Sequence, residues 1–220
     1  MKNKTDIIQQ IKKSGADFAG ACPFSEDIQK LFNVNSPLMI NIVKDKFKEN
    51  EKFRSIIVAG MHIEDPYLDA WTYLDNRNPM SLANQYLGQI LSNTCVRLER
   101  EGYHSVPLLY SSLYLKDAAC HAKLGVIGKN NLLVTPEFGP RIRLRALLTE
   151  AEVPIEDKEL VNPCGDCDAP CIKACPVNAF ASGKYDRDTC YEYAKNNLKK
   201  VSSHTYLWCR ECELACPVGN

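Results

Sequence analysis

The chemistry of this chain is concentrated in its cysteines. The sequence has 220 residues and eleven cysteines, and eight of these fall between Cys164 and Cys216. The N-terminus lacks an apolar run long enough for a secretory signal, so we expect a cytoplasmic protein in which cysteines stay reduced. Thiolates in that setting bind iron–sulfur clusters or zinc. The spacing therefore predicts a metal centre rather than disulfides.

Both groups of cysteines end in Cys-Pro, at Cys175-Pro176 and Cys216-Pro217. In two-cluster ferredoxins the cysteine before the proline ligates the other cluster. By this analogy the sequence predicts two [4Fe–4S] clusters with crossed ligands. Set one, for cluster one, is Cys164, Cys167, Cys171 and Cys216, and set two, for cluster two, is Cys175, Cys190, Cys209 and Cys212.

Two spacings in this pattern depart from the usual one. Three residues separate Cys167 from Cys171 where ferredoxins have two, and Cys190 lies far before Cys209. Two structural zinc sites with four cysteines each are the alternative, because they also use paired two-residue spacings. An absorption spectrum with metal analysis distinguishes the two interpretations.

The composition is that of an ordinary globular protein. Hydrophobic residues make up 45% and charged residues 25%, and 27 basic residues balance 27 acidic ones. The balance gives no reason to expect binding to DNA or to a membrane surface. No apolar stretch is long enough to cross a bilayer.

Hydrophobic periodicity predicts helices and strands in irregular alternation, which indicates an α+β fold. The acidic segment 153–163 reads as a linker between a domain at 1–155 and a cysteine-rich domain at 160–220. We expect helices near 5–13, 25–32, 38–53, 81–101, 116–124 and 188–200, and strands near 16–21, 55–63, 105–110, 132–135 and 142–149.

The stretch from Lys116 to Val134 resembles epoxyqueuosine reductases, above all in Leu124-Gly125-Val126-Ile127-Gly128-Lys129-Asn130. The paired ferredoxin motif follows it, as it does in that family. The resemblance implies a nitroreductase-like corrinoid domain, related to that of reductive dehalogenases, before a ferredoxin-like domain. It further implies an oxidoreductase that passes electrons through two [4Fe–4S] clusters to cobalamin.

The resemblance also implies partners and site residues. The electron donor would be a ferredoxin or flavodoxin, and the substrate a small molecule or a corrinoid protein. Glycines in the loop would let the backbone approach a flat cofactor. The implied cofactor-binding residues are Leu124, Gly125, Gly128, Lys129, Asn130 and Asn131.

The sequence departs from the family in three places. No carboxylate stands in residues 108–114, where the family has its catalytic acid, so Tyr110 or Tyr114 would have to replace it. The family's Tyr-His pair is absent from the start of the long helix. The chain ends shortly after Cys216, without the family's helical repeats. We therefore expect neither epoxyqueuosine nor tRNA as a ligand.

Other interpretations stay open from the sequence. The chain could be a ferredoxin-type electron carrier with no further cofactor, or a flavin reductase that binds FMN. Cys22, Cys95 and Cys120 read as buried small side chains. The three alternating arginines read as the solvated face of an edge strand, or as a phosphate or carboxylate contact: Arg141, Arg143 and Arg145.

Overall fold

The computed structural model describes residues 6–31, 53–73, 80–108 and 112–219. They form a mixed α/β fold that gathers into two compact units. Unit 1 draws on 1–61, 86–124 and 144–160, and unit 2 on 62–85, 125–143 and 161–220. The units thus interleave along the chain, whereas the sequence predicted one boundary near 155–160. No helix in the described stretches has the length and apolar character needed to cross a membrane.

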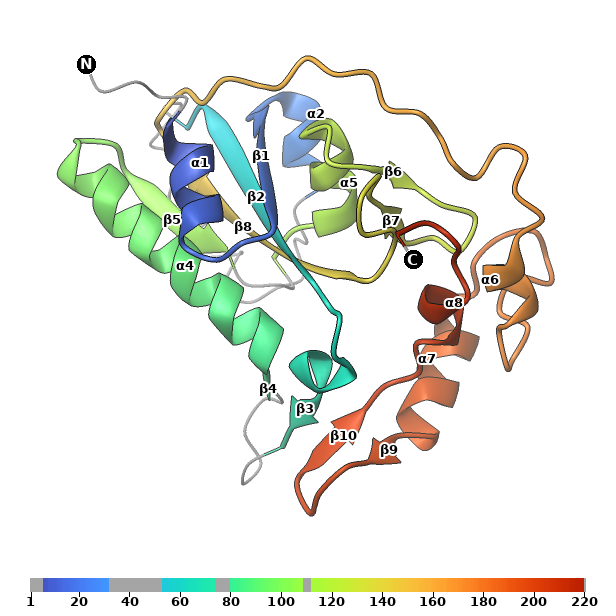
Figure 1. Cartoon of the computed structure of the whole chain (residues 1–220). Coiled ribbons are helices and arrows are strands. Elements are labelled where there is room, and N and C mark those ends of the chain that lie inside the picture. The colour runs from blue at the N-terminus through green and yellow to red at the C-terminus, as the bar shows by residue number, and fades with distance from the viewer. Residues whose placement is uncertain (1–5, 32–52, 74–79, 109–111, 220) are drawn as a thin grey trace. The chain divides into compact units, whose positions relative to one another are not determined.

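A four-stranded sheet forms the centre of unit 1 (Figure 1). Its strand order is β1 (Phe18–Pro23), β2 (Ser55–His62), β8 (Ile142–Thr149) and β5 (Ser105–Leu108). The pairs β1–β2 and β5–β8 are antiparallel. Strand β8 is therefore internal, and the prediction that its arginines line a sheet edge is wrong.

Helices cover both faces of this sheet (Figure 1). On one face, α1 (Asp6–Lys13) and α4 (Leu82–Arg100) bury Ile11, Leu87 and Leu91 against the sheet. On the other face lie α2 (Glu26–Gln29) and α5 (Leu115–His121). Strands covered on both faces must be apolar at every position, and six consecutive residues of β2 are buried.

Unit 2 is built from short elements. A small sheet has the order β4 (Met80–Ser81), β3 (Trp71–Thr72), β10 (Thr205–Leu207) and β9 (Lys199–Lys200), and β6 (Val126–Ile127) pairs with β7 (Leu133–Val134). The helical elements are η1 (Pro66–Asp69), α6 (Pro170–Lys173), α7 (Arg187–Asn196) and α8 (Glu211–Leu214). All eight clustered cysteines lie in this unit.

Strong periodicity predicted the longer elements well. The helices expected near 5–13, 81–101 and 116–124 and the strands near 55–63 and 142–149 are found within a few residues. The helix expected near 188–200 ends at Asn196, and its last two residues form β9 instead. Most of the helix expected at 38–53 lies outside the described residues.

Candidate functional site

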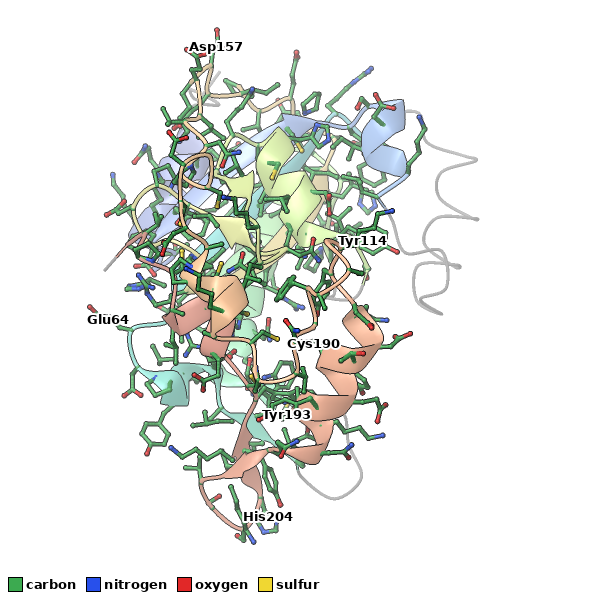
Figure 2. The ribbon with its side chains drawn as sticks, turned by 90° about the vertical axis from the view of Figure 1, so that its right-hand side faces the viewer. Glu64, Tyr114, Asp157, Cys190, Tyr193 and His204 are labelled. Carbon is green, nitrogen blue, oxygen red and sulfur yellow. The ribbon has the colours of Figure 1, made fainter. Side chains whose placement is uncertain are left out.

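Short helices carry three of the eight clustered cysteines, and the other five lie in the turns and loops beside them. Cys171 lies in α6 and Cys212 in α8, and Cys190 lies in α7 (Figure 2). The Asp186 side chain caps α7 by accepting hydrogen bonds from Asp188 N and Thr189 N, 3.1 and 3.0 Å away. This cap fixes the first turn of the helix that presents Cys190.

The folded chain brings the eight thiols together in two groups of four. Cys171 interacts electrostatically with Cys164, Cys167 and Cys216. Cys212 interacts in the same way with the three remaining thiols, Cys175, Cys190 and Cys209. The groups have the same members as set one and set two. Cys216, 45 or more residues away from the rest of its group in sequence, thus joins the first loop by folding and not by proximity along the chain.

The donor chemistry of each group fits an iron–sulfur cluster. Burial raises the pKa of the Cys212 thiol to about 12, and it also raises the pKa values of Cys171, Cys209 and Cys216. Such thiols are protonated at neutral pH, so metal binding must release protons. A cube takes one thiolate at each of its corner irons, so four thiols per group match one [4Fe–4S] cluster.

The loop at 125–131 packs against both cysteine groups. A Cβ at Gly128 would lie 3.2 Å from the Cys164 sulfur and 2.7 Å from a methyl of Val134, so a larger residue there would have to displace these side chains. Lys129 Nζ donates to the carbonyl of Cys167 at 2.7 Å, and buried Asn130 donates from Nδ2 to the carbonyl of Cys212 at 3.2 Å. The loop therefore supports the chain around set one and set two.

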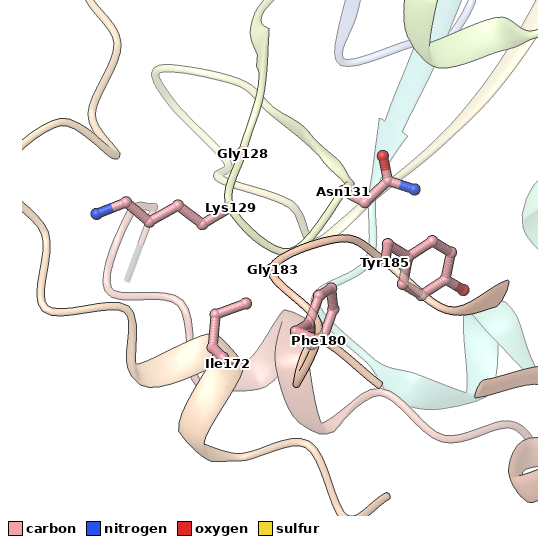
Figure 3. A pocket seen from close by; sticks show the side chains of 7 residues that line it. All are labelled: Gly128, Lys129, Asn131, Ile172, Phe180, Gly183 and Tyr185. Carbon is pink, nitrogen blue, oxygen red and sulfur yellow. The ribbon is translucent and has the colours of Figure 1, made fainter. Parts of the chain in front are cut away.

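A cavity of about 430 Å³ lies beside this loop (Figure 3). The loop contributes Gly128, Lys129 and Asn131 to its lining, and the cysteine-rich segment contributes Ile172, Phe180, Gly183 and Tyr185. The Lys129 amine points away from the rings of Phe180 and Tyr185. The remaining lining offers aromatic faces and an amide to a ligand.

Of the six cofactor-binding residues implied by the resemblance, three line the cavity and three do not. Leu124 is buried in unit 1, where it packs against Gly20. Gly125 allows the chain before β6 to lie close to the end of β7, because a Cβ there would lie 2.5 Å from the carbonyl oxygen of Val134. Asn130 holds the Cys212 loop. Tyr110 lies outside the described residues, and Tyr114, at the start of α5, is exposed.

Sequence reasoning missed the cavity residues of the cysteine-rich segment. The Tyr185 ring packs on Phe180 at a centroid distance of 5.5 Å, and its hydroxyl interacts electrostatically with the Cys190 thiol. Burial, followed by the interaction with Cys190, raises the pKa of Tyr185. The only signal in the sequence is that Tyr185 stands close before a ligand cysteine.

Two of the three alternating arginines, Arg141 just before β8 and Arg143 within it, have internal partners. Buried Arg141 donates to the carbonyls of Cys216 at 3.1 Å and Val218 at 2.8 Å. Arg143 bridges two buried carboxylates, Asp69 of η1 and Glu213 of α8. Burial alone would lower the pKa of Arg143, but the carboxylates raise it. These side chains contact the chain's own carbonyls and carboxylates, and they do not form a solvated face.

No family model matches the sequence. Curated proteins do match it over parts of their length. An epoxyqueuosine reductase of Listeria monocytogenes is 31% identical over 114 residues, which cover 47% of this chain and 29% of the relative. The enzyme of Gloeobacter violaceus is 32% identical over 106 residues, or 44% of this chain and 33% of the relative. The matched region spans about a third of these relatives.

Solved structures share the fold over nearly the whole chain. An epoxyqueuosine reductase crystallised with an epoxyqueuosine-modified tRNA stem loop has a TM-score of 0.67 at 17% identity. The match covers 98% of this chain and 65% of the reductase chain. A catabolic reductive dehalogenase has a TM-score of 0.70 at 18% identity, and the match covers 100% of this chain and 33% of the dehalogenase chain. Another reductive dehalogenase, described with B12-dependent dehalogenation, has a TM-score of 0.66 at 18% identity. The match covers 96% of this chain and 31% of that dehalogenase chain.

One sequence-based expectation is overturned by these structures. We expected tRNA to be excluded as a partner because the chain ends soon after Cys216. The epoxyqueuosine reductase that shares this fold was solved with a tRNA stem loop, so the exclusion is wrong. The chain is similar to epoxyqueuosine reductases in part of its sequence and in fold, and to reductive dehalogenases in fold, as its loop and its paired cysteine motif had indicated.

Proposed function

We propose that this chain passes single electrons through two [4Fe–4S] clusters to a corrinoid bound at the cavity beside the 125–131 loop. The observation that carries the proposal is the shared lining of that cavity. Gly128 packs against Cys164 of set one, and Tyr185 interacts electrostatically with Cys190 of set two. A ligand in the cavity would therefore lie close to ligands of both clusters.

The cavity supports a flat cofactor on physical grounds. Its volume of about 430 Å³ falls in the range of small-molecule sites, roughly 300–1,000 Å³. Aromatic faces at Phe180 and Tyr185 and the Asn131 amide match a ring system with polar edges. The cavity would hold one part of a macrocycle. A bound corrinoid would supply a reducible cobalt, which no side chain offers.

The chain's own residues have supporting roles in this function. The cysteines hold the clusters, and Asn130, Lys129 and Arg141 fix the carbonyls next to three of them. Arg141 also places a buried positive charge near Cys216, which favours the more negative, reduced state of cluster one.

Anaerobic reconstitution tests the proposal. The protein should bind about eight iron and eight sulfide per chain, two cubes of four each. Titration with cob(II)alamin should then change the absorption and electron paramagnetic resonance (EPR) spectra of its cobalt. A colourless protein with stoichiometric zinc would contradict the clusters. Two intact clusters without any cobalt response, or with tightly bound FMN in place of cobalamin, would contradict the corrinoid.

A cavity-filling variant locates the cofactor. Ile172→Trp enlarges a side chain that lines the cavity and should weaken cobalamin binding at least about tenfold while iron content stays the same. Ile155→Trp makes the same change at an exposed position and should bind like the wild type. Equal binding by both variants would place the corrinoid elsewhere.

A further inference from the structure

A closed turn in unit 2 supplies a fixed surface of backbone. The N–H groups of Thr135 and Gly139 each donate to the carbonyl of the other residue at 3.0 Å. The hydroxyl of buried Thr135 also donates to the Gly139 carbonyl, at 3.1 Å. The Phe138 ring stacks on His62 at a centroid distance of 4.9 Å. The turn is thus held by bonds and contacts of its own, so another segment can pack on it.

The segment 217–219, which we call the clasp, lies directly against this turn. A Cβ on Gly139 would lie 2.0 Å from the carbonyl oxygen of Val218, and a Cβ on Gly219 would lie 2.3 Å from the carbonyl carbon of Phe138. Both neighbours are backbone atoms, which cannot rotate away as a flexible side chain can. The two glycines also have left-handed φ angles of +56° and +76°. The two backbones therefore meet without room for a side chain at either position.

Arg141 binds the same segment through its side chain. Its Nη1 donates to the Cys216 carbonyl at 3.1 Å and its Nη2 to the Val218 carbonyl at 2.8 Å, and the residue is only 8% exposed. Hydrogen bonds from a charged donor are stronger than those between neutral groups. The clasp belongs to no helix or strand, so these contacts set the course of the backbone that follows Cys216.

We propose that the clasp seats Cys216 at the fourth iron of cluster one. Gly139, Gly219 and Arg141 are then positioning residues, because they act on the cluster through this one ligand. The inference rests on the iron–sulfur part of the proposed function. The other three ligands of set one come from one short loop, whereas Cys216 reaches them only through folding. Loosening the clasp should therefore free the iron that Cys216 holds before any other.

A freed corner has a defined redox consequence. A [4Fe–4S]2+ cluster that loses one electron and one Fe2+ becomes [3Fe–4S]+, which keeps all four sulfides. In the experiment the electron passes to ferricyanide, which becomes ferrocyanide, and the released thiolate takes up a proton from water. The three-iron product has an unpaired electron, whereas the intact [4Fe–4S]2+ cluster has none. EPR of the oxidised protein therefore counts the opened clusters directly.

Gly219→Ala is the decisive variant because one methyl group pushes the clasp off the turn. The anaerobically reconstituted protein is treated briefly with a molar equivalent of ferricyanide. Compared with wild type, we expect roughly tenfold more three-iron signal, the scale on which groups that support a metal ligand act. Gly102→Ala is the matched control, because Gly102 also has a positive φ, +91°, but nothing lies within 4 Å of its Cβ position.

A double variant shows whether the glycine acts through the ligand. Cys216→Ala removes the ligand itself and should give the full three-iron signal. If Gly219 acts only by seating Cys216, adding Gly219→Ala to Cys216→Ala should change neither the signal nor the iron content. A general loss of stability would instead lower the iron content of the double variant below that of Cys216→Ala.

Each outcome decides the proposal. More three-iron signal in Gly219→Ala than in wild type and Gly102→Ala, with no further effect in the double variant, supports it. An unchanged signal, an equal rise in Gly102→Ala or a further loss of iron in the double variant would overturn it.

If Gly219→Ala takes up no iron, Arg141→Lys decides, because it keeps the charge and loses the planar group that reaches both carbonyls. A raised three-iron signal in that variant supports the proposal, and a wild-type signal overturns it. Failure of both variants to take up iron would make the clasp a requirement for folding and overturn it as well. A wild-type protein without clusters would instead refute the proposed function, so the two failures are distinguishable.

Discussion

Individual cysteines in this chain have very different surroundings. Cys22 and Cys95 lie in the core of unit 1, 0% and 5% exposed, away from the thiol groups of unit 2. Burial raises the pKa of both to about 12, and for Cys95 the Glu99 carboxylate adds to the effect. The interpretation of these two as buried small side chains is confirmed.

Their chemistry follows from that pKa. A thiol with a pKa near 12 is protonated at neutral pH, and only the thiolate reacts. Its thiolate fraction is about three orders of magnitude below that of a free cysteine. Iodoacetamide should therefore leave Cys22 and Cys95 unmodified in the folded protein and label both after unfolding in urea, as peptide mass spectrometry can measure. Labelling at equal rates in folded and unfolded protein would contradict the burial.

At the same scale, the sequence was informative only where chemistry follows from residue type and spacing. Cysteine is rare and its spacing indicates a ligand, so the eight candidate cluster ligands could be predicted from the sequence. Tyr185 and Ile172 carry no such signal, because ordinary aromatic and aliphatic residues become cavity walls only through folding. Gly128 was expected to approach a cofactor, and it lines the cavity while also packing against Cys164.

Elements far apart in the sequence meet at an ion network in unit 2. Arg143 of β8 lies 74 residues from Asp69 of η1 and 70 from Glu213 of α8, and Arg210 also pairs with Glu213. The sequence could not reveal these partners, so alternating arginines suggested a solvated edge. The side chains of Asp69 and Glu213 are only 3% and 5% exposed. Their charges therefore depend on the arginines for compensation.

Breaking this network should destabilise unit 2. Arg143→Met leaves Asp69 without the partner that it has in the folded protein and Glu213 with Arg210 alone. Loss of one member of a buried ion pair costs about 3–5 kcal/mol, which predicts a melting temperature lower by roughly 10 °C for a chain of this length. Calorimetry of the reconstituted protein measures it.

The control removes the same charge from a solvated site. Arg54→Met changes an exposed arginine and should leave the melting temperature within about 2 °C of the wild type. Arg143→Lys keeps the charge but loses the planar guanidinium group that meets both carboxylates. Its melting temperature should therefore lie between those of Arg143→Met and Arg54→Met. Equal melting temperatures for Arg143→Met and Arg54→Met would show that the network contributes no stability.

For the whole molecule, the two units are stabilised in different ways. Unit 1 has a continuous core of large aliphatic side chains, among them Ile11, Ile57 and Leu147. In residues 161–219 the buried apolar side chains are small ones: Cys171, Ala179, Ala194 and Cys216. The sequence predicted a separate cysteine-rich domain, but it could not show that 62–85 and 125–143 complete it. Those segments join it through contacts such as Arg143–Glu213 and Lys129–Cys167, which no local pattern reveals.

Removal of iron should therefore unfold one part of the chain and leave the other intact. Four small side chains bury too little apolar surface to hold 59 residues, so metal binding must supply much of their folding free energy. In hydrogen exchange, amides of 161–219 should lose nearly all protection once a chelator strips the iron. Amides of β2 and α4 should keep theirs, which provides an internal control in the same sample. Equal protection of 161–219 with and without iron would mean that this segment folds without its clusters, and that the cysteines serve chemistry alone.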